Sequence, residues 1–402
     1  RVKNQVTKGL WVVRGVDSVD VAKRQISFRA SGVDPDQDPY FVDYFQINFD
    51  GTGLVRYTHA NGNHTLYWSP DGRYNVDMDS RVDLPTVMEL RRVADGRVTV
   101  LEKGDMSAML ATGWRPPEVF VATGRDGKTD TWGILVRPTN FDPSRKYPVI
   151  EQIYAGPRGN FVPKSWGGGL SLQPLAELGF IVIQIDGMGT NDRSKAFHDT
   201  YYGNFGDNGL PDHITALKQL AARYPFMDLD RVGIYGHSGG GFASADAILR
   251  YPDFFKVAVA SSGNHDNRSY NIYWAEKYQG FLVRDTLRRT DNFEASANKT
   301  LAGNLKGKLL LMHGDMDDNV HPAMTIQLVD ALIRANKDFD LIIAPNRAHS
   351  LNEPYFIRRR WDFFVRHLLG AEPPAGYEIQ RGPGAAEEDE VPEACDPARE
   401  EC

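Results

Sequence analysis

A serine, a group of aspartates and a histidine follow one another in an order that could support nucleophilic catalysis. Ser238 is the centre of Gly-His-Ser-Gly-Gly at 236–240, which fits the pattern Gly-x-Ser-x-Gly. A polar loop at 313–321 with three aspartates comes later, and His349 follows that loop. A serine hydroxyl is a poor nucleophile at neutral pH unless a base takes its proton and a carboxylate orients the base. These residue types therefore predict acyl transfer through a serine, with His349 as the base.

Spacing alone leaves the acid of such a triad open. The order Ser, then Asp or Glu, then His is that of α/β-hydrolases, and the candidates are Asp315, Asp317 and Asp318. Asp-rich loops are also common turns, because Asp bonds its own backbone. His313 and His321 do not fit the triad order, so we interpret both as ordinary solvated or hydrogen-bonded side chains.

The segments around these residues predict where the groups lie. Ser238 stands between an apolar, strand-like run at 231–235 and a small-residue, helix-like run at 242–249. Two further strand-like runs, 308–312 and 340–344, precede the aspartate loop and the histidine. A nucleophile must project from a sharp strand-to-helix turn, where flanking glycines leave room for the neighbouring chain. Groups just past the carboxyl ends of strands lie where an open α/β sheet places its chemistry.

The organisation of the chain changes near residue 118. After this point strands alternate with helices, which predicts a parallel sheet covered on both faces. Before it, residues 10–101 have the pattern of short alternating strands, separated by Asp-Gly pairs at 50–51, 71–72 and 95–96. Asp-Gly predicts hairpin turns in which both central residues have positive φ. Regular hairpins at this pitch are typical of propeller blades.

The fold class we predict is α/β, with an α/β-hydrolase catalytic domain preceded by an incomplete all-β propeller. The boundaries are 1–108 for the partial propeller blades, 109–371 for the catalytic domain and 372–402 for an acidic tail. The first segment holds two or three blades, whereas a closed propeller usually has four to eight. We therefore expect earlier blades before Arg1, or blades from another chain. The tail is rich in Pro, Gly and Glu, so we expect it to be disordered.

Composition narrows the function further. The formal net charge of −7 argues against nucleic acid as a partner, because phosphate binding needs a basic surface. No apolar run is long enough to span a membrane, and no zinc-type cluster is present, so we expect neither a metal nor a cofactor. Both cysteines, Cys395 and Cys402, lie in the acidic tail, so the core needs no disulfide. The chain opens on Arg1 without an apolar leader, which we interpret as a processed form or a fragment.

Attack by Ser238 on a carbonyl creates an oxyanion that needs hydrogen-bond donors. The backbone N–H of the residue after the nucleophile, Gly239, points at that oxygen in this type of turn. A second donor must come from the loop after an early strand, and Tyr154 is the side-chain donor in Tyr-Ala-Gly-Pro at 154–157. We therefore expect Tyr154 and Gly239 to hold the oxyanion.

Three motifs together resemble the prolyl oligopeptidase family of serine peptidases, in its dipeptidyl-peptidase-IV-like branch. They are Gly-His-Ser-Gly-Gly-Gly at 236–241, His-Gly followed by Asp-Asp-Asn-Val-His within 313–321, and Ala-His at 348–349. The resemblance implies that Asp317 is the triad carboxylate. It also implies that Asn319 and Val320 belong to the substrate site, and that Tyr154 stabilises the oxyanion.

The resemblance also suggests where the substrate side chain binds. In this branch an aromatic cluster walls the pocket beside the scissile bond, and Tyr270 and Trp274 stand at the matching positions, with packing in the core as the alternative. The branch usually has a Tyr after the nucleophile, which packs on a substrate proline. Gly239 departs from that pattern, and we expect the missing ring to widen the pocket. Enzymes that release dipeptides hold the free amine with two glutamates on an earlier blade, which would precede Arg1.

The predicted function is hydrolysis of short peptides by a dipeptidyl-aminopeptidase-like or oligopeptidase action. A carboxylesterase of the same fold is one alternative, because the same triad hydrolyses esters. A hydrolase fold that has lost activity and acts as a binding module is another. The partners we expect are peptide substrates and, in a homodimer, a second copy of the chain. The resemblance also suggests a periplasmic or secreted location, which the sequence itself leaves open.

Overall fold

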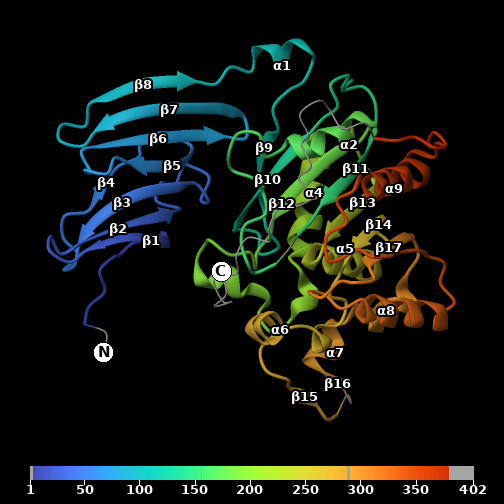
Figure 1. Ribbon diagram of the computed structural model, residues 1–402. Helices are drawn as coiled ribbons and strands as arrows, with labels where there is room; N and C mark the ends of the chain where they lie inside the picture. Colours follow the sequence, from blue (N-terminus) through green and yellow to red (C-terminus); the bar gives the residue numbers. More distant parts are fainter. Residues whose placement is uncertain (1–2, 155, 288–289, 380–402) are drawn as a thin grey trace.

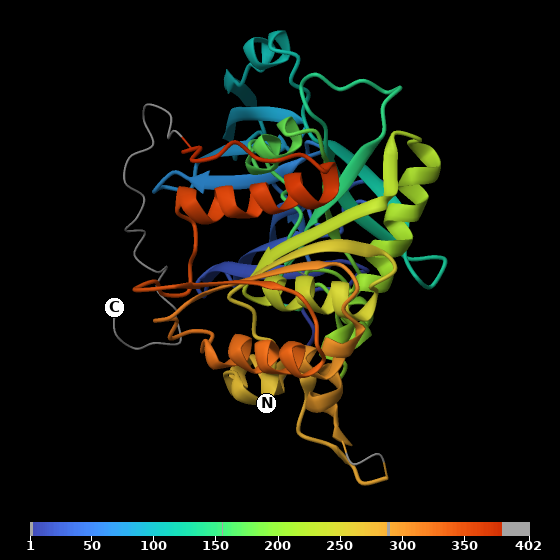
Figure 2. The ribbon, with the colours of Figure 1, turned by 90° about the vertical axis from the view of Figure 1, so that its right-hand side faces the viewer.

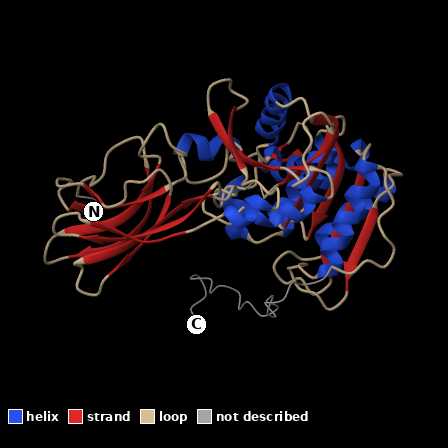
Figure 3. Ribbon diagram, turned by 90° about the horizontal axis from the view of Figure 1, so that it is seen from above, coloured by secondary structure: helices blue, strands red, loops and turns tan. Residues whose placement is uncertain are grey.

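The computed structural model describes residues 3–154, 156–287 and 290–379. The chain forms a strand-only part followed by a part in which strands and helices alternate (Figures 1 and 3). The strand-only part contains β1 (Val12–Asp20), β2 (Gln25–Ser31), β3 (Val42–Asn48), β4 (Val55–Arg56), β5 (Asn63–Trp68), β6 (Tyr74–Arg81), β7 (Leu84–Arg92) and β8 (Val98–Lys103).

These strands make two four-stranded sheets, in the orders β1-β2-β3-β4 and β5-β6-β7-β8. Every neighbouring pair is antiparallel, so each sheet is a meander with the strand number of one propeller blade. Neither sheet closes on itself, and the described residues contain no further blade. The expected incomplete propeller is thus confirmed, with two blades.

The Asp-Gly pairs lie in three strand connections, as predicted, but their backbone differs from the prediction. Positive φ is found only at the glycines, with 85° at Gly51, 67° at Gly72 and 66° at Gly96. The aspartates keep ordinary φ because each carboxylate accepts the backbone N–H two residues on, at 2.9, 3.1 and 3.2 Å. The expectation of positive φ at both positions was therefore wrong.

The second part is built on an eight-stranded sheet in the order β18-β17-β14-β13-β11-β12-β10-β9. Its strands are β9 (Glu118–Thr123), β10 (Asp130–Val136), β11 (Tyr147–Gln152), β12 (Ile181–Asp186), β13 (Met227–His237), β14 (Phe255–Ser261), β17 (Lys308–Gly314) and β18 (Asp340–Ala344). The pairs from β12 to β18 are parallel, whereas β10 is antiparallel to both β9 and β12. This is the sheet expected of an α/β-hydrolase.

Helices lie around this sheet (Figure 2). They are α2 (Gln173–Glu177), α3 (Lys195–His198), α4 (Leu210–Arg223), α5 (Gly239–Arg250), α6 (Ile272–Gln279), α7 (Asn292–Ser296), α8 (Ala323–Arg334) and α9 (Pro354–Phe364). The short helix α1 (Ser107–Ala111) stands apart, in the connection between β8 and β9 (Figure 1). A short hairpin, β15 (Arg284–Asp285) with β16 (Thr290–Asp291), lies near α6 and α7 in Figure 1.

Two apolar cores lie on opposite faces of the sheet, because side chains alternate along each strand. On β13, Val232 and Ile234 join a core with buried residues of α4, α5 and α8, whereas Tyr235 joins a core with α2 and α9. Parallel strands covered on both faces are typical of α/β folds. Because the strands are held from both sides, the loops at their carboxyl ends have a rigid support.

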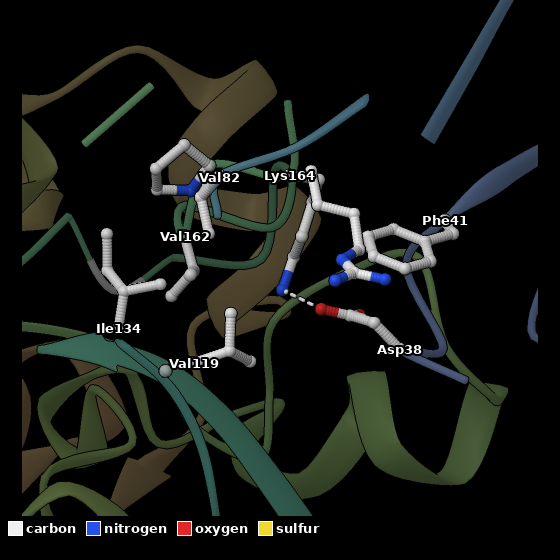
Figure 4. Close-up of a pocket in the computed structure, with 10 residues that line it drawn as sticks. Asp38, Phe41, Val82, Val119, Ile134, Val162 and Lys164 are labelled. Atoms are coloured by element: carbon white, nitrogen blue, oxygen red, sulfur yellow. Dashed lines mark hydrogen bonds and ion pairs between the residues drawn. The ribbon is translucent and has the colours of Figure 1, made fainter. Parts of the chain in front are cut away.

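The propeller blades contact the hydrolase part through polar groups. Arg14 pairs with Asp192 at 2.9 Å, and the Tyr40 and Thr190 hydroxyls lie 3.4 Å apart. Lys164 pairs with Asp38 at 2.9 Å beside a cavity of about 10 Å3, which has room for roughly one water molecule (Figure 4). Both side chains of this last pair are buried, so it ties the two parts together away from solvent.

The ends of the predicted domains are only partly covered by the structure. In the predicted tail, residues 380–402, including Cys395 and Cys402, lie outside the described residues. The boundaries at 108 and 371 stay predictions. The strands of the two blade sheets all precede residue 108 in the sequence, and those of the eight-stranded sheet all follow it. Among the described helices, none combines the length and apolar character needed to cross a bilayer.

Candidate active site

Ser238 lies on a sharp turn between β13 and α5, as the sequence predicted. Its φ is 58°, a strained value for a residue with a side chain. The turn is tight because Gly236 and Gly240 both pass close to the carbonyl oxygen of Ile153, where a Cβ on either glycine would collide with it. The Ser238 N–H donates to the Ser261 carbonyl at 2.9 Å, which anchors the turn to β14.

His349 and Asp317 form a hydrogen-bonded pair beyond the ends of β18 and β17. The distance between His349 Nδ1 and Asp317 Oδ2 is 2.8 Å. An ionised carboxylate has no proton to give, so Nδ1 carries the hydrogen and Nε2 of the neutral ring is left as the acceptor. This is the tautomer that a general base for a serine needs.

The structure distinguishes among the three aspartates that spacing left open. Asp317 is buried, whereas Asp315 and Asp318 are exposed. Burial alone would raise the pKa of Asp317, but hydrogen bonds from His313, from His349 and from the Val320 N–H together hold it well below its usual value. Asp317 is therefore ionised at neutral pH and is the carboxylate that contacts His349.

Ser238 contacts the candidate oxyanion donor, and the residue before it contacts the candidate base. Its side chain is hydrogen-bonded with the Tyr154 hydroxyl. The preceding residue, His237, packs its ring against that of His349, with ring centres 4.6 Å apart. Burial, with the nearby His349 as a second cause, lowers the pKa of His237 to about 4, so this neighbour is uncharged at neutral pH. The structure thus brings all three predicted triad residues to one edge of the sheet.

The two expected oxyanion donors lie next to the serine. Gly239 is the first residue of α5, where backbone N–H groups have no acceptor within the helix. Tyr154 follows β11, and burial raises the pKa of its hydroxyl, so the hydroxyl keeps its proton. Its ring packs near that of Phe161, with centres 5.8 Å apart. Both donors can therefore face an oxygen bound at Ser238.

Two further aromatic residues border the site beside Tyr154. The Tyr270 hydroxyl donates to Asn319 Oδ1 at 2.7 Å, which joins two predicted substrate-binding residues. Burial, followed by the neighbouring Tyr154 and Asp317, raises the pKa of Tyr270 to about 12. Trp274, on α6, packs edge-on to Tyr270 with ring centres 6.4 Å apart. These residues lie together, as expected from the sequence.

The space next to Gly239 is bordered by Trp274. Its indole Cζ2 would lie 3.4 Å from a Cβ at position 239, which is an ordinary van der Waals contact. Trp274 therefore forms a wall beside Gly239. That the missing ring at position 239 widens the substrate pocket stays a prediction.

Val320, expected at the substrate site, has a buried side chain. Its backbone N–H donates to Asp317 Oδ1 at 2.8 Å, and its carbonyl lies 2.8 Å from His313 Nε2. Its contact with a substrate stays a prediction. Val320 supports the loop, whereas its exposed neighbour Asn319 remains available for binding.

His313 is the site residue that sequence reasoning passed over. We interpreted it as an ordinary hydrogen-bonded side chain, and its hydrogen bond is made to Asp317, at 3.0 Å. The triad order concerns three residues and has no place for a second histidine. A signal was nevertheless present, since His313 is the penultimate residue of the strand before the aspartate loop and lies four residues from Asp317. His321, by contrast, caps the backbone of Ala323.

Metal binding finds no support in these side chains. No group of His, Cys, Asp and Glu suited to a metal ion occurs within residues 3–154, 156–287 and 290–379. The site acids and bases bond to one another instead.

Comparison with known proteins gives one family and several relatives. The family model described as "Prolyl oligopeptidase family" matches residues 167–371. Human dipeptidyl peptidase 8 is 29% identical over 390 residues, which cover 90% of this chain and 41% of that protein. This chain therefore spans about two-fifths of that curated relative.

Two solved structures are similar over 91% of this chain and 51% of their own chains. One is a candidate dipeptidyl aminopeptidase IV from Bacteroides ovatus, with a TM-score of 0.79 and 26% identity. The other is dipeptidyl peptidase 4 from Porphyromonas gingivalis, with a TM-score of 0.77 and 25% identity. Both likenesses extend across the blades as well as the eight-stranded sheet.

Proposed function

Because this chain belongs to the prolyl oligopeptidase family, as its motifs predicted, we propose that it is the catalytic portion of a serine peptidase. The substrates would be short peptides, cleaved in a dipeptidyl-aminopeptidase-like or oligopeptidase manner. The observation that carries the proposal is the arrangement of Ser238, Asp317 and His349 beyond the carboxyl ends of β13, β17 and β18, with His349 and Asp317 bonded at 2.8 Å. The names of the relatives support a peptidase over other uses of this fold.

The proposed reaction has two halves. Ser238 Oγ attacks the scissile carbonyl while His349 Nε2 takes its proton, and Asp317 keeps the imidazole oriented and stabilises the imidazolium. The carbonyl oxygen becomes an oxyanion, which receives hydrogen bonds from Tyr154 and from the Gly239 N–H. The tetrahedral intermediate collapses, the C–N bond breaks, and His349 returns the proton to the leaving amine. Water then hydrolyses the acyl-enzyme by the same steps.

Further parts of the proposal concern what lies around the site. Tyr270, Trp274 and Asn319 would contact the substrate beside the scissile bond. Two blades are fewer than the four to eight of closed propellers, so we infer that more blades complete the propeller, from an upstream segment or another chain. A homodimer is a further hypothesis, which light scattering of the purified protein tests.

The deciding experiment uses a fluorophosphonate probe and two substrate panels. We expect the probe to label the wild-type protein and to leave a Ser238→Ala variant unlabelled. Dipeptidyl anilides should then be cleaved faster than simple acyl esters. Ester turnover without cleavage of any peptide would point to a carboxylesterase, and absence of labelling in the wild type would point to a binding module without activity.

A further inference from the structure

Asp317 is held by two histidines, one of which has no place in the proposed triad. Its Oδ2 lies 2.8 Å from His349 Nδ1 and 3.0 Å from His313 Nε2. His349 is partly exposed, whereas His313 is fully buried on the side away from solvent. Asp317 is therefore fixed from behind by a side chain that cannot itself reach a substrate.

The partners of His313 fix its orientation. Nε2 faces two acceptors, Asp317 Oδ2 and the Val320 carbonyl, the second at 2.8 Å. Neither acceptor carries a proton, so the hydrogen must be on Nε2. Nδ1 lies 2.7 Å from the hydroxyl of Thr325 on α8, which has a proton to donate to the neutral ring. Each ring nitrogen thus has a partner that matches one tautomer.

Resting on the proposed function, we propose that His313 is a positioning residue that sets the orientation of the Asp317 carboxylate toward His349. A carboxylate on a loop can rotate about its own bonds, and a misplacement of about 1 Å in a catalytic array can cost about 100-fold in rate. His313 restricts that rotation by donating to the same oxygen that accepts from His349. Through the Val320 carbonyl it also restrains the loop that carries Asn319.

The hydrogen bond from His313 to Asp317 also has an electrostatic effect on His349. The titratable and charged groups that face Asp317, His313 and His349 include His237 from the nucleophile turn, His265 and Tyr270 from the segment after β14, and Arg360 from α9. A donor on Asp317 disperses the negative charge that would otherwise stabilise the His349 imidazolium. Loss of the His313 donor should therefore leave a more basic carboxylate, and the acid limb of the pH–rate profile should move to higher pH.

The test compares His313→Leu with His313→Gln. The Gln side chain keeps an N–H donor, whereas Leu keeps only apolar volume. We expect kcat for a cleaved peptide to fall on the order of 10-fold or more in His313→Leu, with the acid limb of kcat/KM moved upward. His313→Gln should restore much of both. A folded His313→Leu protein with wild-type kcat and an unmoved acid limb would overturn the proposal.

A matched control separates positioning from simple loss of a buried histidine. His64 is also buried and bonds a carboxylate, Asp77, at 2.9 Å and a backbone carbonyl, that of Ala60, at 3.0 Å, but it lies in the second blade. His64→Gln should lower stability and leave kcat and the acid limb of the folded protein unchanged. Equal changes in kcat and pH profile in the His64 and His313 variants would mean that His313 acts through stability alone.

A second pair of variants covers the case in which His313→Leu does not fold. Thr325→Val removes the hydroxyl that holds Nδ1 and leaves both His313 and Asp317 in place. Thr131→Val removes a buried hydroxyl that bonds the Ala122 carbonyl at 3.0 Å, remote from the site. A loss of kcat in the first variant only supports the proposal, and equal behaviour contradicts it. Fluorophosphonate labelling of the wild type comes first, because a protein that is not labelled at Ser238 fails the proposed function and not this inference.

Discussion

Both parts of the molecule bury a histidine against an aspartate, but the surroundings of the two pairs differ. His64 on β5 bonds diagonally to Asp77 on β6, where Asp79 is its direct partner in register, and both nitrogens of His64 point at acceptors. The carboxylate of Asp317 lies on a loop and is shared by two histidines, one of them partly exposed. In the blade, a histidine and an aspartate therefore hold two strands together. In the hydrolase part, the same residue types leave Nε2 of His349 available as a proton acceptor.

His64 and His349 differ in whether the ring can accept a proton. Burial would lower the pKa of His64, yet the hydrogen bond and charge of Asp77 raise it above its ordinary value, which favours the charged ring. Both ring nitrogens also lie within hydrogen-bond distance of acceptors, which suits a ring that carries both protons. A ring that keeps both protons cannot accept a third group's proton. His349, with one nitrogen bonded to Asp317, can. Location at a strand end, and not the pair itself, makes the second arrangement suitable for catalysis.

The largest expected effect separates the two aspartates. Asp317→Asn should lower kcat by roughly 10,000-fold, because an amide at this place favours the wrong tautomer of His349. Asp77→Asn should leave kcat of the folded protein near wild type and instead cost about 3–5 kcal/mol of unfolding free energy, as expected when a buried pair loses a partner. Peptide hydrolysis and thermal unfolding of both variants measure the two effects. A large loss of kcat in folded Asp77→Asn, or wild-type kcat in Asp317→Asn, would contradict the distinction between the pairs.

The next largest effect compares two tyrosine hydroxyls, that of Tyr154 in the hydrolase part and that of Tyr40 in the first blade. Tyr154→Phe should lower kcat by roughly 100- to 1,000-fold, the usual cost of one oxyanion donor, with KM changed little. Tyr40→Phe removes a buried hydroxyl where the first blade contacts the hydrolase part, 3.4 Å from that of Thr190. This control should keep kcat. Wild-type kcat in Tyr154→Phe would exclude the tyrosine from the oxyanion site.

A smaller effect is expected at the aromatic border of the site. Trp274→Ala should change kcat/KM by roughly 2- to 10-fold, in line with the loss of one aromatic contact. The change should depend on the size of the substrate residue at the scissile bond, because Trp274 fills space beside Gly239. Tyr273→Ala, at an exposed neighbour on the same helix, provides the control. Equal effects across all substrates would show that Trp274 only supports the fold.

The smallest effect is a pH dependence of stability in the blade. The folded pKa of His64 is raised, so its contribution is fully present below the unfolded pKa and is lost as pH rises through the folded pKa. His64→Gln should therefore lower Tm by a few degrees more at pH 5 than at pH 9. Asp317 has the opposite sign, because its lowered pKa gives stability that is lost only on acidification. Thermal melts from pH 5 to pH 9 measure the Tm difference between the wild type and His64→Gln. A larger difference at pH 9 than at pH 5 would contradict the raised pKa of His64.

Much of the fold followed from local patterns. The alternation of strands and helices after Glu118, the hairpins before Lys103 and the strand–turn–helix at Ser238 could all be predicted, because each depends on residues close in sequence. The Asp-Gly backbone was misjudged for a local reason as well, since the aspartate carboxylates satisfy the turns without positive φ. The number of blades could not be predicted beyond two or three, because it depends on which strands pair in each sheet.

By itself, the sequence determined which residue types stand at the strand ends and in what order, and hence a serine, a histidine and an acid from a short list. The family resemblance already indicated Asp317 among those acids. Only the tertiary structure decided that Asp317 is buried, that the Val320 side chain is buried, that Trp274 lies beside Gly239 and that His313 bonds the same carboxylate from the buried side. The physical reason is that burial and hydrogen-bond partners depend on groups brought together from different strands, and spacing along one chain does not specify them.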